Sequence, residues 1–128
     1  MKGIQYMNTV KIKKSSSPMT TVKVKYCDTF ISKFLGLMFS QELKPENGII
    51  IVEKNETRIN TAIHMMFVNF DLTVLWLDKS LVIVDKVLAK RWVPFYASKK
   101  SAQYVVELHR SKFSEFSIGD QLILSNEE

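Results

Sequence analysis

The sequence predicts an α+β fold that is predominantly β, a compact and mostly antiparallel sheet or barrel-like domain with one short helix over about residues 29–38. Three observations support this class: two segments alternate in polarity, several runs are rich in β-branched residues, and one segment has helical spacing. With 128 residues, 46% of them hydrophobic, the chain is expected to form a single domain over residues 1–128.

The alternating segments predict strands with one buried face. In "TVKVKYC" (21–27), Val22, Val24 and Tyr26 share one face and lysines occupy the other. "AQYVVELH" (102–109) alternates in a similar way. This period of two is typical of antiparallel sheets, and we expect some seven or eight strands in total.

More continuously apolar, β-branched runs predict central strands, and short polar breaks between them predict loops. The runs are "GIIIVEK" (48–54), "LTVLWLD" (72–78) and "LVIVDKVLAK" (81–90). The predicted breaks are "KNE" (54–56) and the hairpin loop "DKS" (78–80), and "GDQLIL" (119–124) is expected to form a turn entering the last strand.

The predicted helix follows Asp28, and either Asp28 or Thr29 can cap its start. Its apolar residues recur at the spacing of one helical face: Phe30, Ile31, Phe34, Leu37 and Met38. Gly36 is unfavourable inside a helix and indicates a tight end or a close backbone contact. We expect a second helical turn around "KFSEFS" (112–117). Residues 1–20 form an N-terminal extension in which "VKIKK" (10–14) is a possible added strand, and Met7 and Met19 are conceivable alternative starts.

The charge distribution permits a polyanion partner without requiring one. The net charge is +5, and residues 1–27 hold six lysines and no acid. A second basic cluster runs from Lys86 to Lys112. Such surfaces attract nucleic acids, but no recognition motif accompanies them, so an ordinary solvated surface remains the other interpretation.

No motif predicts a cofactor or a metal ion. The four glycines cannot form a phosphate-binding loop, and the chain contains neither CxxC nor HExxH. We expect no membrane partner, because no apolar stretch approaches the length of a span, and no secretory signal. A cytoplasmic location is expected, and the lone Cys27 is compatible with it.

His64 lies in the apolar stretch "TAIHMMFVNF" (61–70). If this stretch is a strand, His64 shares a face with Ala62 and Met66. The ring is then either a packed group with backbone partners or a donor lining a pocket near a carboxylate, with Asp78 and Glu107 as the first candidates.

"KRWVPFY" (90–96) gathers Trp92, Phe95 and Tyr96 around Pro94. Exposed aromatic side chains on a loop can stack on a sugar ring or a nucleobase. The alternative is a loop whose aromatic rings fold back as a lid on the core. The sequence leaves both interpretations open.

Several of these stretches together resemble the family of unknown function DUF192 (UPF0127-type), in the form typical of archaeal members. "CDTFISKFLGLMFS" is similar to its "ADT…R..GLMFR" opening, "NGIIIV" to its "GMLFVF" strand, and "IHMMFVNFDLTVLWLD" to its "IHMFFVxFPIDVVFLD" signature. "WVPFY", "AQYVVELH" and "IGDQLIL" match later motifs in order, so the resemblance covers about residues 21–125. It implies a compact β-rich fold with a small helix. The matching motif residues include Asp28, Gly36, Met38, Pro94, Gly119 and Asp120.

The chain departs from the family pattern at a few positions. Thr73 stands where the signature usually has an acid, and Asp71 supplies an acid two positions earlier. Lys33 and Leu35 stand near the "GLMF" motif where arginines are common. A family ligand set involving these groups would be altered here, whereas a structural ion pair could be exchanged harmlessly.

Three functions follow as hypotheses. The first is a small-ligand or partner-binding module without catalysis, lined by His64, Trp92, Tyr96 and Glu107. The second is a hydrolase in which Asp78 or Glu107 acts as general base with His64. The third is nucleic-acid binding through the lysine-rich surfaces. The sequence does not specify the ligand, the protein partner or the oligomeric state.

Overall fold

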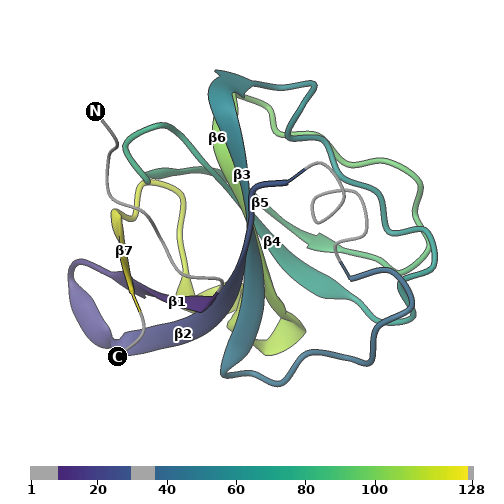
Figure 1. The fold of residues 1–128 in the computed structure, drawn as a ribbon, viewed down its shortest axis with the longest axis horizontal. Helices are drawn as coiled ribbons and strands as arrows, with labels where there is room; N and C mark the ends of the chain where they lie inside the picture. Colours follow the sequence, from purple (N-terminus) through teal and green to yellow (C-terminus); the bar gives the residue numbers. More distant parts are fainter. Residues whose placement is uncertain (1–8, 30–36, 127–128) are drawn as a thin grey trace.

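The computed structural model describes residues 9–29 and 37–126 and contains one curled sheet (Figure 1). Its elements in chain order are β1 (Thr9–Lys14), β2 (Ser17–Cys27), β3 (Asn47–Thr57), β4 (Leu72–Leu77), β5 (Ile83–Ala89), β6 (Ala102–His109), the 3-10 helix η1 (Arg110–Glu115) and β7 (Leu122–Asn126). The predominantly β class predicted from the sequence is confirmed, and so is the strand expected over residues 10–14, which is β1.

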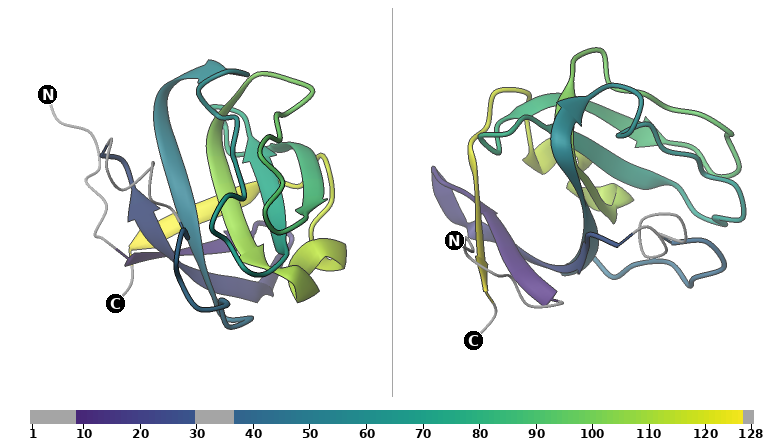
Figure 2. Two further views of the ribbon diagram at one scale, coloured as in Figure 1. Left: turned by 90° about the vertical axis from the view of Figure 1, so that its right-hand side faces the viewer. Right: turned by 45° about the horizontal axis from the view of Figure 1, so that its top comes forward.

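The strands follow the order β5-β4-β6-β3-β2-β1-β7, and every neighbouring pair is antiparallel except β2 with β3 (Figure 2). The two ends of this order approach each other at one place. The amide of Leu122 donates to the Leu81 carbonyl at 2.9 Å, and that of Ile83 donates to the Asp120 carbonyl at 3.0 Å. The sheet therefore curls into a half-barrel that is joined across β5 and β7 at one point.

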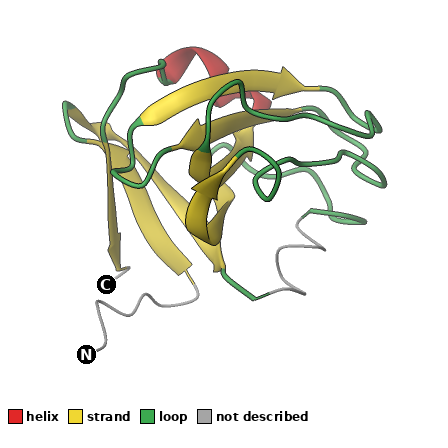
Figure 3. Ribbon diagram, turned by 90° about the horizontal axis from the view of Figure 1, so that it is seen from above, coloured by secondary structure: helices red, strands yellow, loops and turns green. Residues whose placement is uncertain are grey.

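Both faces of the curled sheet are buried. The inner core contains Ile50, Leu75, Val106 and Leu108, with Phe116 beside them. The outer core contains residues from the opposite faces of the same strands: Cys27, Ile49, Val74, Trp76 and Val105. The long loops before β4 and before β6 cover part of this outer face (Figure 3).

Some predicted strands and breaks are wrong in detail. β5 lies at one end of the strand order rather than at its centre. Its outer edge bonds at its first residue, Ile83, to the segment that precedes β7. The break predicted at 54–56 lies inside β3, whose last residues are polar and exposed because they extend beyond the core. The stretch around His64 is no strand, and only Ile63 forms a bridge, with Tyr96. The hairpin loop at 78–80 is confirmed.

The helix predicted over 29–38 falls largely on residues 30–36, which lie outside the described residues, as does Gly36. Leu37–Ser40 forms a turn. The helical turn expected near 112–117 is confirmed as η1. Over the part of the chain that the structure describes, no helix is long and apolar enough to cross a membrane.

Candidate functional site

Three tight turns present an aromatic residue at the same position. In each turn the amide of the fourth residue donates to the carbonyl of the first: Ser40 to Leu37 at 3.1 Å, Val68 to Met65 at 3.1 Å, and Val93 to Lys90 at 3.3 Å. The third residues have positive φ: Phe39 at 60°, Phe67 at 63° and Trp92 at 65°. Positive φ at this position is the requirement of a type II turn, which glycine normally meets.

A fourth turn shows the usual solution. Over Ser117–Asp120 the Asp120 amide donates to the Ser117 carbonyl at 3.0 Å, and the third residue is Gly119 with a φ of 98°. A side chain in this conformation costs about 1–2 kcal/mol per residue. Each aromatic turn therefore carries a strain that glycine would remove.

The three turns are joined to one another by their backbones. The amide of Phe39 donates to the Phe67 carbonyl at 2.9 Å, and that of Trp92 donates to the Met65 carbonyl at 2.9 Å. The Trp92 indole N–H donates to Asn69 Oδ1 at 2.9 Å. Consequently, segments far apart in the sequence form one unit, at the end of the molecule where the long loops gather (right in Figure 1).

Asp71 fixes the turn that carries Trp92. Its Oδ1 accepts from the Arg91 amide at 2.9 Å, and its Oδ2 lies 3.5 Å from the Lys90 ammonium. The hydrogen bond from the Arg91 amide, followed by the nearby Lys90 charge, lowers the pKa of Asp71. The acid that the sequence places two positions before Thr73 thus positions this turn.

The three rings form a continuous exposed surface, called here the aromatic cluster (Phe39, Phe67 and Trp92). The Phe39 and Phe67 rings stack with centroids 4.9 Å apart, and the Trp92 ring meets Phe67 edge-on at 5.1 Å. Their exposed fractions are 72%, 39% and 44%, so none of them belongs to either core. Strain without burial is typical of functional sites rather than of packing.

His64 and Tyr96 lie in the two loops behind the cluster. Ile63 and Tyr96 exchange backbone hydrogen bonds of 2.8 and 2.9 Å. The Tyr96 hydroxyl accepts from the Lys90 amide at 2.8 Å, and its ring packs on the outer core. The ring Nδ1 of His64 accepts from the Met66 amide at 3.2 Å. The structure therefore brings His64, Trp92 and Tyr96 into one pair of loops.

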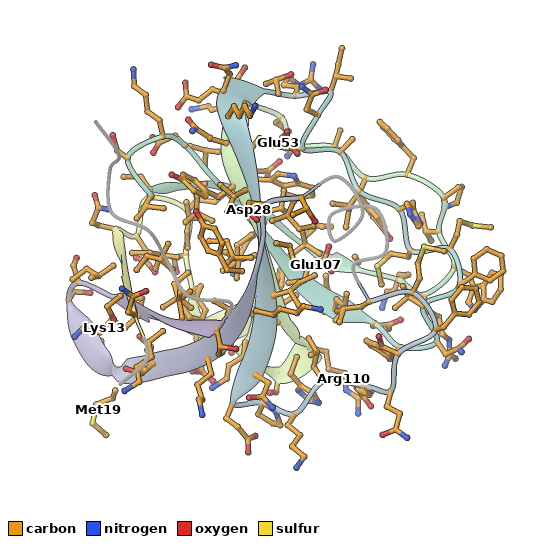
Figure 4. The ribbon with its side chains drawn as sticks, in the orientation of Figure 1. Lys13, Met19, Asp28, Glu53, Glu107 and Arg110 are labelled. Carbon is orange, nitrogen blue, oxygen red and sulfur yellow. The ribbon has the colours of Figure 1, made fainter. Side chains whose placement is uncertain are left out.

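Glu107 lies on β6 within the outer face, between Ile49 of β3 and Val74 of β4 (Figure 4). It is 6% exposed, and among the described residues no side chain or amide bonds to its carboxyl group. Burial raises its pKa to about 7. A buried carboxyl that titrates near neutrality marks a possible functional group.

Asp78 and Thr73 have other surroundings. Asp78 follows β4 at the end away from the aromatic cluster, and its Oδ1 accepts from the amides of Ser80 at 2.8 Å and Val82 at 3.1 Å. Thr73 is buried, and its hydroxyl donates to the Arg110 carbonyl at 3.3 Å. Neither side chain joins His64, Trp92 and Tyr96.

The motif residues have mostly local positions. Asp28 directly follows β2, Met38 is the second residue of the Phe39 turn, and Pro94 is exposed in the loop after Trp92. Asp120 closes the Gly119 turn, since its Oδ2 accepts from the Ser117 amide at 2.8 Å. Among the described residues, no three His, Cys, Asp or Glu side chains gather as a metal site would require.

The sequence indicates Trp92 as a candidate but not its partners Phe39 and Phe67. A weak signal was present: "LMFS" and "MFVN" each place a phenylalanine where a turn follows an apolar run. Nothing in the sequence indicated that these rings would be exposed or would meet, because both facts depend on hydrogen bonds between distant turns.

Comparison with known proteins identifies the family. The model of DUF192, described as an uncharacterized ACR, matches residues 10–124. A UPF0127 protein of Pyrococcus furiosus is 38% identical over 103 residues, which are 79% of this chain and 85% of the relative. A UPF0127 protein of Thermococcus kodakarensis is 44% identical over 85 residues, 66% of this chain, and there the match spans about half (52%) of the relative's length.

Two solved structures share the fold. One, from Sinorhizobium meliloti 1021 and provisionally named a transcription regulator, has a TM-score of 0.80 at 19% identity and covers 96% of this chain and 98% of its own. The other, a protein of unknown function from Novosphingobium aromaticivorans, has a TM-score of 0.74 at 16% identity and covers 90% and 83%. On the match to its family model, the chain belongs to the DUF192 family.

Proposed function

We propose that this protein is a binding module without catalysis, which holds a partner or small ligand at the aromatic cluster. One observation carries the proposal: three separate turns place an aromatic residue in a conformation that favours glycine, and all three rings are exposed. Strained residues of this kind cluster at ligand clamps and switch regions, and the strain persists only where the surroundings enforce it. We also propose a cytoplasmic location, with which the lone Cys27 is compatible.

A photo-crosslinking experiment in the cells that make the protein tests the binding surface. The photoreactive residue p-benzoylphenylalanine replaces Phe39 in one variant and Ile118 in the other. Ile118 is 60% exposed and lies on the Gly119 turn. This turn bonds to Ile83 at the start of β5, whereas the Trp92 turn follows the end of β5, so the two positions lie at opposite ends of that strand. We expect an adduct at position 39 and none at position 118. Equal adducts at both positions, or none, would remove the proposal.

The hydrolase hypothesis has one observation in its favour, the pKa of Glu107 near 7, which suits a general base at neutral pH. It predicts that purified protein turns over simple ester or phosphoester substrates and that Glu107→Gln abolishes this activity. For nucleic-acid binding through the lysine-rich surfaces, affinity for a mixed oligonucleotide should fall steeply with added salt.

A further inference from the structure

The aromatic cluster offers its partner carbon rather than hydrogen-bonding groups. The indole N–H of Trp92 is bonded to Asn69, and the amides of Phe39 and Trp92 are bonded to carbonyls of the neighbouring turns. The three rings themselves therefore present apolar surface, and their nearby hydrogen-bonding groups are already used within the turns.

The cluster alone covers less area than a stable protein interface. The exposed fractions of its three residues correspond to roughly 300 Å² of surface, given the size of aromatic side chains. A stable complex buries about 800 Å² on each partner, and two copies joined through this surface would fall equally short. A lipid surface sets no such minimum, because each ring that enters the boundary between headgroups and acyl chains contributes on its own.

Positive charge adjoins the rings. Lys90 and Arg91 directly precede Trp92 and are both exposed, and the chain as a whole carries a net charge of +5. Lys90 Nζ lies 3.5 Å from Asp71 Oδ2, and the Arg91 charge also helps to lower the pKa of Asp71, so one carboxylate partly offsets two cations. Aromatic residues beside lysine and arginine form the usual composition of segments that lie at the surface of an anionic bilayer.

We propose that the aromatic cluster docks this protein onto an anionic lipid surface, with the three rings at the headgroup boundary and Lys90 and Arg91 against the phosphates. The inference rests on the proposed binding function and names its partner. It requires no spanning segment, and it departs from the expectation, drawn from the sequence, that no membrane is a partner.

Vesicle sedimentation tests this docking. The probe is a vesicle of equal parts phosphatidylcholine and phosphatidylglycerol at low salt, and the variants are Phe39→Gly and the matched control Ile118→Ser. Glycine relieves the positive φ of position 39, so this variant is expected to stay folded and to melt at a higher temperature than wild type. We expect its partition onto vesicles to fall at least tenfold, while the control stays within about twofold of wild type.

Tryptophan fluorescence gives a second readout. The chain has two tryptophans, and Trp76 is buried while Trp92 is 44% exposed. Docking should therefore shift the emission of Trp92 to shorter wavelength, and lipids brominated near the headgroup should quench it. Phosphatidylcholine alone and high salt should both weaken the binding.

The outcomes separate the two proposals. If wild type does not sediment with anionic vesicles, or if Phe39→Gly binds them as well as wild type does, the lipid inference is wrong. A protein adduct at position 39, or self-association lost in Phe39→Gly, would in that case leave the binding function standing with a different partner. If positions 39 and 118 also crosslink equally or not at all, both proposals fail.

Discussion

Glu107 shows what a single buried carboxyl does to the pH dependence of stability. Its pKa rises from 4.5 to about 7 on folding, because burial disfavours the charged form. Between these values the folded state binds more protons than the unfolded state, so the free energy of unfolding falls as the pH rises. The loss amounts to about 3 kcal/mol and is complete above pH 7.

The substitution Glu107→Gln removes this titration. We expect the variant to be more stable than wild type at pH 8 and to vary less between pH 5 and 8, as measured by urea unfolding at several pH values. The matched control is Glu46→Gln, which changes an exposed carboxylate in the same way and should keep the wild-type dependence. A wild-type stability that rises over this range would contradict the assignment.

At the aromatic cluster, some single residues can be predicted from the sequence and others cannot. The sequence predicts Trp92 and Glu107 as candidates because an aromatic residue on a loop and an isolated acid are visible in it. Phe39 and Phe67 cannot be recognised in the same way, since phenylalanine ordinarily predicts a core position and positive φ is ordinarily expected at glycine. Their position depends on backbone bonds between turns that are distant in the chain.

At the scale of elements, Asp78 caps the hairpin loop between β4 and β5. Its carboxylate accepts two amides of the loop, so Asp78→Ala should cost about 1–2 kcal/mol of stability. Asp78→Asn keeps an acceptor oxygen and should recover most of this loss. Thermal unfolding of the three proteins provides the measurement. Unchanged stability in the alanine variant would mean that the hairpin does not need this cap and would return Asp78 to the list of possible functional groups.

The strands themselves could largely be predicted, because period-two patterning and β-branched runs report burial directly. Their boundaries and neighbours could not. The polar end of β3 predicts a break in the sequence pattern, because a strand that extends beyond the core loses its apolar residues. The sequence of β5 predicts a central strand although β5 lies at an edge of the strand order. Part of this edge is covered, because the segment before β7 bonds to Ile83, the first residue of β5. The stretch around His64 alternates without belonging to the sheet, because its partner is another loop.

For the molecule as a whole, β1 is an inner strand of the sheet, although the sequence analysis assigns its residues to an N-terminal extension. It pairs with β2 on one side and β7 on the other, and it contributes the fully buried Val10 and Ile12 to the inner core. A chain that starts at Met19 loses both side chains and leaves β7 without its partner strand. Each large buried aliphatic side chain is worth about 2–5 kcal/mol.

We therefore expect the chain that starts at Met19 to lose cooperative unfolding, whereas one that starts at Met7 keeps β1 and should unfold like wild type. Circular dichroism during heating distinguishes the two. A cooperative transition in the shorter chain would show that the half-barrel closes without β1.

The pairing of β1 with β7 also bears on how the protein is made. Val10 lies opposite Asn126, and these residues are separated by more than a hundred others along the chain. During synthesis β1 leaves the ribosome first and remains without one of its two neighbours until the last strand has emerged. Contacts between such distant segments make folding slow, and a strand with one unpaired edge is prone to aggregation in the meantime. The half-barrel is thus completed only after translation of β7, and its first strand spends the longest time exposed.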